Sequence, residues 1–434
     1  MTAPGTTPRP EAEPTEQPTE QPTEQLVEQR EPVPGGRGLG LAVALDGCGW
    51  HPAAWREAEA RPGELFSGRY WTDLVQEAEH GRLDFVTIED TLALQSSRFD
   101  GPDERVDEVR GRLDAVLVAA RVAPRTRGIG IVPTAVVTHT EPFHLSKAIA
   151  TLDHVSSGRA GVRVRVAGSP ADAAHFGRRD VPAPPASPGA WPAEFVADLF
   201  DEAGDYVEVV RRLWDSWEDD AEIRDVATGR FIDREKLHYI DFAGRWFSVR
   251  GPSIVPRPPQ GQPLVTALAH ADLPYRFAAR SADLVHVTPR DAADAARIVA
   301  EVRAAWQAAG RPAADVRVFA DLVVFLDDAP GQAVARRERL DERSGRGRPY
   351  RSDARIFVGS PAGLADLIEQ WSALGIDGFQ LRPAVLPTDL VTITRGLAPE
   401  LRRRGLFRAE YGAGTLRGTL GLGLPANRYA EAAT

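Results

Sequence analysis

The sequence predicts an α/β protein with the (β/α)8 fold of a TIM barrel, with insertions and a disordered N-terminal tail. Eight short apolar runs alternate with segments of helical periodicity along one chain of 434 residues. Several of the runs are bounded by glycine and read as continuous apolar stretches, which is typical of strands buried on both faces of a parallel sheet. A doubly wound open sheet is the alternative, because periodicity alone does not close a barrel.

The N-terminal segment differs from the rest in composition. The motif PTEQ repeats in tandem from Pro14 to Gln25, and hydrophobic residues are nearly absent from residues 1–36. Such a segment cannot bury enough apolar surface to offset the entropy of ordering it. We therefore expect a disordered, acidic tail over 1–36 and one barrel domain over 37–428.

The eight apolar runs have the length and composition of buried strands. They are residues 39–45, 85–90, 127–137, 160–168, 264–270, 284–289, 316–326 and 378–383.

Segments with apolar residues at helical spacing separate these runs. The segment 142–158 begins with proline and ends at glycine, as helix capping favours. The expected helices are 70–78, 106–117, 142–158, 194–217, 274–281, 291–309, 361–374 and 387–404.

Three stretches depart from the alternation. Residues 169–192 are proline-rich and irregular, and residues 218–262 read as an excursion of short strands and turns. The basic stretch 342–355 interrupts the rhythm after the seventh strand, and we interpret it as a solvated loop.

Composition narrows the class of partner and the compartment. The net charge of −10 argues against a nucleic-acid backbone as partner. A single cysteine, Cys48, excludes an internal disulfide framework and suits a reducing cytoplasm. The first residues lack the basic and apolar regions of a secretory signal, and no apolar run approaches the ~18 residues that span a bilayer. We expect a cytoplasmic protein that binds neither nucleic acid nor membrane.

In a barrel, the residues that carry chemistry lie where strands end at the C-terminal rim. Asp90 could instead cap the following helix, and each histidine alone could be structural. The candidates are Asp46, Cys48, Glu89, Asp90, Thr134, Arg163, Arg165, His270, His286, Thr288 and Arg382.

Arg163 and Arg165 are the most informative pair among these candidates. Side chains two residues apart on a strand share one face, so both guanidinium groups should point into the barrel. An unpaired buried charge is very costly, so either acidic side chains or a ligand must compensate them.

Established catalytic motifs give no competing hypothesis. The sequence contains no Walker loop, HExxH, CxxC or GxSxG, and the pair Gly128 and Gly130 lacks the third glycine of a dinucleotide fingerprint. No spacing of histidine and acidic residues supports a metal site.

Sequence segments distributed from about residue 39 to 428 resemble those of the bacterial luciferase superfamily of flavin-dependent monooxygenases. The similarity is to the branch with nitrilotriacetate, dibenzothiophene-sulfone and long-chain alkane monooxygenases. The phrases are residues 49–57, 81–94, 127–161, 206–221, 244–263, 277–285, 357–383 and 397–422.

The resemblance implies a TIM barrel that binds reduced FMN, delivered by a separate flavin reductase, and that activates dioxygen to oxidise a small organic substrate. It leaves two alternatives open: an oxidoreductase that uses the deazaflavin F420, and a non-catalytic barrel that partners an active paralogue. We also expect a homo-oligomer.

Carried over residue by residue, the resemblance is uneven. Asp90 and Thr134 match an acidic residue and a threonine of the family. The other positions differ from the family's residues. After the third strand, Val136 and Val137 stand where the family has Ser-Thr, and in the fourth strand Arg163 and Ala167 stand where it has Asn and Ser. Before the long helix, Val196, Leu199 and Phe200 stand in place of His, Arg and Tyr, and after the fifth strand Ala269, His270 and Ala271 stand in place of the Gly-Ser-Ser phosphate loop.

The resemblance implies that hydroxyls and backbone amides of the loop after the fifth strand hold the flavin phosphate in the family. Arg163, Arg165 and His270 could replace them, or they could mark a different ligand or a member that no longer binds flavin. As cofactor-binding residues we therefore expect Asp90, Thr134, Arg163, Arg165 and His270, all around one mouth of the barrel.

The tail gives the first testable prediction. Deleting residues 1–36 should leave folding intact, because the segment has no apolar face to dock. Thermal unfolding of the full-length and truncated chains checks this, and a melting temperature lowered by more than a few degrees contradicts it.

Overall fold

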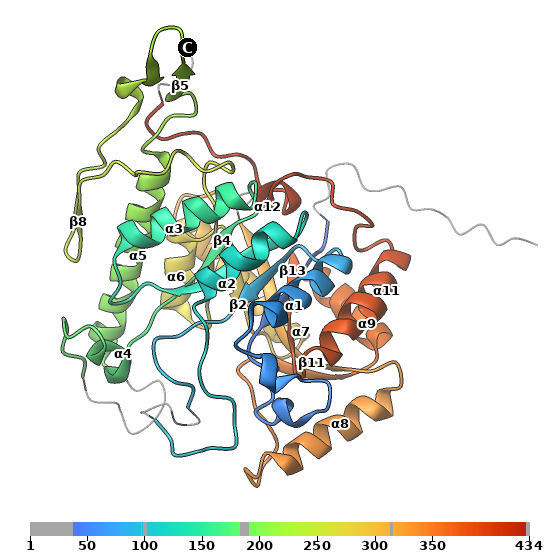
Figure 1. Ribbon diagram of the computed structural model, residues 1–434. Helices are drawn as coiled ribbons and strands as arrows, with labels where there is room; N and C mark the ends of the chain where they lie inside the picture. Colours follow the sequence, from blue (N-terminus) through green and yellow to red (C-terminus); the bar gives the residue numbers. More distant parts are fainter. Residues whose placement is uncertain (1–37, 97, 99–101, 183–190, 313–315, 431–434) are drawn as a thin grey trace, which may run out of the picture. The chain divides into compact units, whose positions relative to one another are not determined.

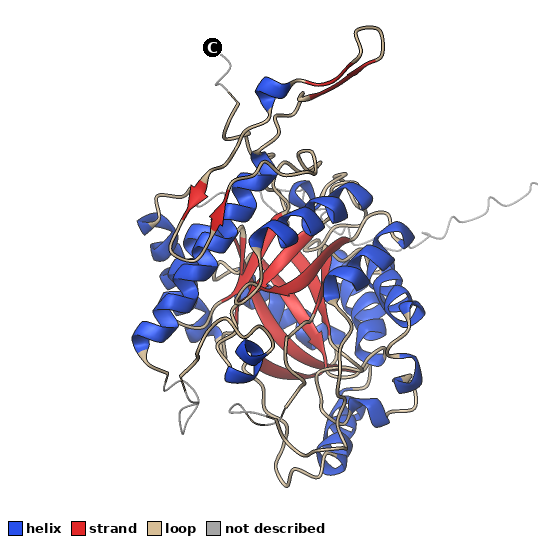
Figure 2. Ribbon diagram, turned by 60° about the vertical axis from the view of Figure 1, so that its left-hand side comes forward, coloured by secondary structure: helices blue, strands red, loops and turns tan. Residues whose placement is uncertain are grey.

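The computed structural model describes residues 38–96, 98, 102–182, 191–312 and 316–430, so the expected tail lies outside the described residues. Eight parallel strands surround a central axis (Figures 1 and 2). They are β1 (Gly40–Leu45), β2 (Phe85–Ile88), β3 (Gly130–Val136), β4 (Gly161–Arg165), β9 (Leu264–Leu268), β10 (Leu284–Val287), β11 (Arg317–Leu326) and β13 (Gly378–Pro383).

These strands close into a barrel. Each pairs in parallel with the next in chain order, from β1 through β4, β9, β10 and β11 to β13, and β13 pairs again with β1. The closure confirms the predicted (β/α)8 fold and excludes the open sheet.

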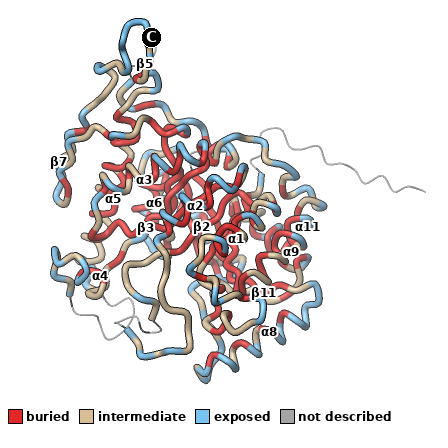
Figure 3. Tube along the Cα trace, in the orientation of Figure 1, coloured by how far each residue is buried: buried red, intermediate tan, exposed pale blue. Residues whose placement is uncertain are grey.

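Helices surround the strands (Figure 2), and Figure 3 shows that the strands and the helix faces toward them are buried. A π-helical turn, Ile393–Leu397, joins α10 to α11, so these two elements form the expected helix 387–404. The helices are α1 (Gly68–His80), α2 (Ala115–Val122), α3 (Pro142–Val155), α4 (Pro170–Ala174), α5 (Ala193–Asp215), α6 (Asp272–Ser281), α7 (Ala292–Ala308), α8 (Pro330–Arg343), α9 (Pro361–Ser372), α10 (Thr388–Thr392), α11 (Ala398–Arg403) and α12 (Leu416–Thr419).

Side-chain caps define several helix starts. Ser67 accepts the backbone N–H of Tyr70 at α1, Asp291 that of Asp294 at α7, and Ser360 that of Gly363 at α9. Short polar residues at these positions satisfy amides that the first helical turn leaves free.

The helix expected over 106–117 is wrong for its first part, because the helix α2 begins only at Ala115. Gly111 adopts a positive φ of 88° that interrupts helical geometry. Ion pairs of Arg110 with Asp103 and of Arg112 with Asp46 hold the preceding chain as a loop at the barrel mouth. Tertiary charge pairing therefore overrides the apolar spacing there.

The short strands expected within 218–262 are present. They form two antiparallel pairs, and Figure 1 shows the first of them projecting away from the barrel. The strands are β5 (Glu222–Asp225), β6 (Arg230–Ile232), β7 (Phe242–Ala243) and β8 (Ser248–Val249).

The basic stretch 342–355 is more than a solvated loop, which corrects the interpretation from sequence. It leads into an extra strand, β12 (Arg355–Gly359), which pairs with the outer half of β11. On the way, Asp353 reaches the buried guanidinium of Arg382 at 2.8 Å. The stretch thus contributes a side chain to the barrel mouth.

The N-terminal end of the barrel is sealed by apolar side chains. Phe85 and Phe319 stack with ring centroids 5.7 Å apart inside the strands. Three leucines of the C-terminal segment belong to the same buried cluster as these two rings: Leu416, Leu420 and Leu422. Arg317 fixes this segment by donating from Nε to the carbonyl of Leu420 at 2.7 Å. The barrel is therefore closed at one end, and a ligand must enter from the other.

No helix within the described residues is apolar over the length that a bilayer crossing requires.

The sealed end gives a stability prediction. A Cβ on Gly378 would lie 2.5 Å from the Phe319 ring and 2.8 Å from the carbonyl oxygen of Gly40. Gly378→Ala should therefore lower the free energy of unfolding by about 1–3 kcal/mol, as overpacking does. Urea unfolding measures it, with Gly412→Ala as the control because no atom lies within 4 Å of that Cβ. Equal stability of the two variants would contradict this packing.

Candidate active site at the barrel mouth

A buried carboxylate, Asp321, organises the inside of the barrel above the apolar plug. Its Oδ1 lies 3.0 Å from Nδ1 of His286, and its Oδ2 accepts from Nη2 of Arg382 at 2.7 Å and from Gln380 at 3.1 Å. Asp321 and His286 are fully buried, and Arg382 is 1% exposed. Strands β10, β11 and β13 are therefore linked inside the barrel by one ionic network.

Burial and pairing set the charge states of this network. Burial alone would raise the pKa of Asp321, but Arg382 and His286 outweigh it and hold that pKa below its usual range. Desolvation lowers the pKa of His286 below its ordinary value, although Asp321 opposes the shift. His286 is therefore neutral near pH 7, with the proton on Nδ1 toward Asp321 and an unprotonated Nε2.

Arg163 is compensated by the protein itself. Its Nη1 donates to Oε1 of Glu89, and both side chains are almost fully buried. Arg165 lies two residues on, is exposed, and donates to the backbone carbonyl of Asp90 at 3.0 Å. Both arginines line the same cavity inside the barrel mouth, as expected for one face of the strand. Arg163 is paired with a carboxylate, whereas Arg165 contacts a backbone carbonyl.

A cavity of about 330 Å³ opens above this network, and we call it the central cavity. Its walls are mostly apolar, from Val164, Phe200, Leu268 and Phe277 among others. Polar side chains line it as well: Trp50, Glu89, Thr134, Arg163, Arg165, His270, Asp353 and Arg382. A cavity that combines apolar walls with converging polar groups is a candidate small-molecule site.

Arg382 shapes one wall of the central cavity. Its guanidinium lies over the ring of Trp50, 4.7 Å from the centroid, and also donates to Asp353 at 2.8 Å. It thereby joins the loop after β1, the loop before β12 and the floor at Asp321. Asp321 and Asp353 raise its pKa above the ordinary value despite its burial, so it is permanently charged.

Two buried donors in the cavity wall lack a partner. Oγ1 of Thr134 and Nε1 of Trp50 have no hydrogen-bond partner among the described residues. Thr266, on the neighbouring β9, has the same unpartnered hydroxyl but does not line the cavity. Because buried polar groups are nearly always hydrogen-bonded, the first two are suited to a ligand.

A wider space, of about 840 Å³, adjoins the central cavity, and we call it the vestibule. Trp50, Glu89 and Arg165 line both spaces. Described residues from two parts of the chain form its sides: residues 91, 93–96, 98, 102 and 112 from the first, and residues 169–172 and 175 from the second. Arg112 within the first segment forms a bidentate pair with Asp46, at 2.6 and 3.1 Å.

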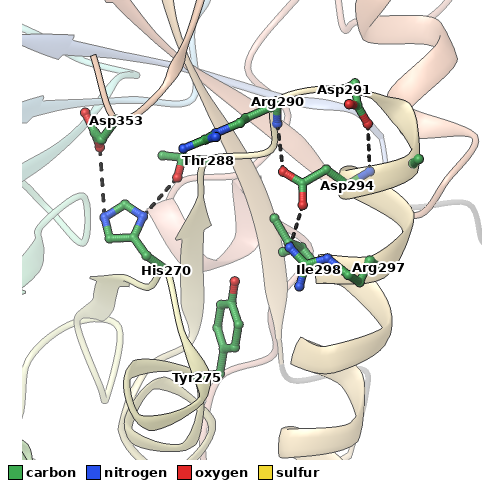
Figure 4. A pocket seen from close by; sticks show the side chains of 10 residues that line it. His270, Tyr275, Thr288, Arg290, Asp291, Asp294, Arg297, Ile298 and Asp353 are labelled. Atoms are coloured by element: carbon green, nitrogen blue, oxygen red, sulfur yellow. Dashed lines mark hydrogen bonds and ion pairs between the residues drawn. The ribbon is translucent and has the colours of Figure 1, made fainter. Parts of the chain in front are cut away.

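A third space, of about 720 Å³, lies between the loops that follow β9 and β10, and we call it the lateral cavity (Figure 4). His270 and Asp353 line both it and the central cavity. Nδ1 of His270 lies 2.9 Å from Oγ1 of Thr288, and its Nε2 lies 3.9 Å from Asp353. Partial burial lowers the pKa of His270, which favours the neutral ring.

The structure brings four of the five expected cofactor-binding residues together. Thr134, Arg163, Arg165 and His270 line the central cavity. Asp90 does not: its carboxylate accepts the backbone N–H of Thr91 at 2.7 Å and of Ala115, the first residue of α2, at 3.0 Å. The capping role considered for Asp90 is thus the one that the geometry supports.

The remaining rim candidates occupy different places. Asp46 lines the vestibule, and Thr288 lines the lateral cavity. His286 is fully buried and lines none of the three spaces. Cys48 is buried, and burial raises the pKa of its thiol to about 11, so it is not a nucleophile at neutral pH.

Trp50, Asp321 and Asp353 are the main residues that the sequence did not single out. Asp321 could have been recognised as the single acidic residue in the middle of the mostly apolar strand 316–326. Asp353 gave no comparable signal, because it lies in a basic stretch outside the eight expected strands. Within the part of the chain that the structure describes, no cluster of three or more acidic, histidine or cysteine residues could hold a metal ion.

Comparison with known proteins assigns this site to a family. The luciferase-like monooxygenase family matches residues 48–378, about three quarters of the chain. The chain belongs to this family. The sequence resemblance, and with it the prediction of a monooxygenase-type enzyme, is thereby confirmed at the level of the family.

Relatives match over nearly the whole chain. Nitrilotriacetate monooxygenase component A of Aminobacter aminovorans is 29% identical over 91% of this chain and 98% of its own. N-acetyl-S-(2-succino)cysteine monooxygenase of Bacillus subtilis (strain 168) is 31% identical over 90% and 98%. The crystal structure of a long-chain alkane monooxygenase superposes with a TM-score of 0.78 at 24% identity, covering 89% of this chain and 96% of that one.

The luciferase-like family generally uses reduced flavin, and the central cavity fits this group only in part. The apolar walls and the free donors of Thr134 and Trp50 suit a flat ring with a polar edge. The end near Phe200 and Phe277 does not suit a phosphate, because these rings, 5.7 Å apart, carry no donor. The resemblance places a tyrosine of the family at Phe200, which keeps the ring but lacks the hydroxyl.

The buried histidine gives a pH prediction. Protonating His286 would put a second N–H, on Nε2, into a site with no acceptor among the described residues. Because its pKa is lowered on folding, the unfolded chain binds more protons below about pH 6.5, and stability must fall as the pH falls.

Replacing His286 should remove its contribution to the fall in the free energy of unfolding at low pH. His286→Asn should show a shallower decline between pH 7.5 and 5.5, by up to about 1.4 kcal/mol per pH unit. Urea unfolding at several pH values measures both proteins. Parallel declines would show that His286 titrates alike in the folded and unfolded states.

Proposed function

We propose that this protein is a two-component, reduced-flavin-dependent monooxygenase acting on a small organic substrate. The observation that carries the proposal is the central cavity, which combines apolar walls with free buried donors at the open end of a closed barrel. That end holds the active site in enzymes of this fold. Family membership supports the reaction class, and the name "component A" of the Aminobacter relative supports a separate reductase.

In this proposal the central cavity holds the flavin ring. The walls around Val164 and Leu268 exclude water from its faces, and the Thr134 hydroxyl and Trp50 indole N–H donate to its polar edge. Reduced FMN, when bound, supplies the electrons that activate dioxygen. Arg382 keeps Trp50 in place through its stacking contact.

The vestibule is the proposed substrate site. It is wider than the central cavity and shares Trp50, Glu89 and Arg165 with it, so a substrate there lies next to the ring. Arg165 contacts no carboxylate among the described residues, and its guanidinium is exposed at this junction. It is the group that would orient an anionic or strongly polar substrate. A cytoplasmic homo-oligomer remains part of the same proposal.

The apolar end at Phe200 and Phe277 favours a second candidate. If no flavin binds there, the chain is a non-catalytic barrel that partners an active paralogue. An enzyme that uses F420 in place of FMN is the remaining alternative. Titration of the purified protein with reduced FMN, oxidised FMN and F420 separates the three. Saturable binding of reduced FMN, followed by oxygen uptake with a flavin reductase, is the expected result, and absence of binding to all three supports the non-catalytic barrel.

Thr134 provides a sharper prediction. Thr134→Val removes an unpartnered buried hydroxyl, so the free protein should gain about 1–3 kcal/mol of stability. The same change should weaken reduced FMN about threefold to tenfold, because one hydrogen bond is lost. Urea unfolding and anaerobic titration measure the two effects.

Thr266→Val is the matched control for this variant. Its hydroxyl is equally buried and unpartnered but lies outside the cavity wall. It should raise stability similarly and leave flavin affinity unchanged. Equal flavin affinity of Thr134→Val and the unmodified protein would remove Thr134 from the site.

A further inference from the structure

Only some of the charged groups in the wall of the vestibule are paired within the protein. Arg112 forms its bidentate pair with Asp46, and Glu89 forms the buried pair with Arg163. Arg98 also has an interaction partner of its own. The chain itself therefore satisfies these groups, and the groups that it leaves unpaired are the ones that indicate a ligand.

Arg165 is a cation of this wall that the chain leaves without a carboxylate. Its Nη1 donates to the backbone carbonyl of Asp90 at 3.0 Å, and the side chain is exposed. A guanidinium carries five N–H donors in a planar fork, so most of them remain available to a carboxylate or another anion. Arg165 lines the central cavity as well as the vestibule, so an anion bound to it lies where the two spaces meet.

Asp172 is an acidic side chain of the vestibule that the chain leaves without a cation. It is 6% exposed, and the Ser169 hydroxyl donates to its Oδ2 at 2.9 Å. This contact caps the short helix α4 but does not involve Oδ1, which has no hydrogen-bond partner among the described residues. A buried aspartate is nearly always fully paired, so the free oxygen indicates a donor that the protein does not supply.

Arg165 and Asp172 do not form an ion pair with each other, although both line a space of about 840 Å³. Two unpaired groups of opposite charge in the wall of one space are complementary to a molecule that carries both an anion and a donor. Apolar side chains that line the vestibule, and not the central cavity, suit an apolar spacer between those two groups. They are Ala93, Leu94, Pro102, Pro170 and Ala171.

We propose that the vestibule binds amphoteric organic molecules, with an anionic group at Arg165 and an amine or amide N–H at Asp172. The inference rests on the proposed function in taking such a molecule as the substrate, and it narrows the substrate class to compounds that join both groups through an apolar spacer. Of the two residues, only Arg165 also lines the central cavity. The anionic end therefore lies next to the proposed position of the flavin ring.

Three probes of equal chain length test the two contacts separately. They are ω-aminohexanoate, which has both groups, hexanoate, which has the anion alone, and hexylamine, which has the donor alone. The corresponding butyl and octyl compounds vary the separation of the two groups. Dissociation constants for the full-length protein are measured by calorimetry, with and without FMN. At one of these lengths the amino acid should bind ~10-fold or more tightly than either matched probe, because it makes both contacts.

Two variants should lose affinity for different probes. Arg165→Gln should weaken the amino acid and the alkanoate ~10-fold or more and leave the alkylamine within ~2-fold, because only the charge-assisted bond to the anion is lost. Asp172→Asn should weaken the amino acid and the alkylamine ~10-fold or more and leave the alkanoate within ~2-fold. This variant keeps an oxygen that can accept from Ser169, so the cap of α4 is retained.

Arg178→Gln and Asp198→Asn are the matched controls. They change residues that pair with Glu141 and Arg245, respectively, outside the vestibule lining, and they should alter no affinity. An amino acid that binds no more tightly than its one-ended probes overturns the inference, as does an affinity that is insensitive to either variant or the absence of saturable binding by every probe. Failure of the flavin function gives a different result: the amino acid still depends on both residues, but FMN does not bind in either redox state.

Discussion

The ion pair between Asp321 and Arg382 is the interaction on which the mouth of this barrel depends. Both side chains are buried inside the strands, where an unpaired charge would be very costly. Arg382 has further contacts, with the Asp353 carboxylate and the Trp50 ring, so the pair also fixes two loops. Loss of either partner would leave the other charge uncompensated and would release walls of the central and lateral cavities together.

Along the barrel axis, the side chains that only stabilise the fold lie at the N-terminal end, and those available to a ligand lie at the other end. Stacked Phe85 and Phe319, covered by the C-terminal leucines, fill the N-terminal end and leave no route through it. Above them, His286 and Asp321 form a polar layer whose charges are balanced within the protein. Only above that layer does open space begin, and the donors that lack partners there, such as Thr134, are those that a ligand can satisfy. The C-terminal segment is thus part of the fold that supports the site.

Much of this arrangement could be predicted from sequence, because it follows from local periodicity. Eight apolar runs gave the barrel, and the period of two along β4 placed Arg163 and Arg165 on one inner face. Periodicity does not predict contacts between side chains that are far apart in the sequence. The Glu89 partner of Arg163, the capping contacts of Asp90 and the approach of Asp353 from outside the eight strands all depend on the closed fold. The helix expected over 106–117 was wrong for the same reason, since pairing of Arg112 with Asp46 holds that segment as a loop.

Charge balance around the three cavities determines where anions can bind. Arg163 is neutralised by Glu89, Arg112 by Asp46, and Arg382 by Asp321 and Asp353. Arg165 contacts no carboxylate among the described residues, whereas Arg290 shares the lateral cavity with Asp291, Asp294 and Asp353. Arg165 lines the central cavity as well as the vestibule, and much of the remaining wall of the central cavity is apolar. An anionic group of a ligand is therefore best accommodated beside Arg165, where the central cavity and the vestibule meet.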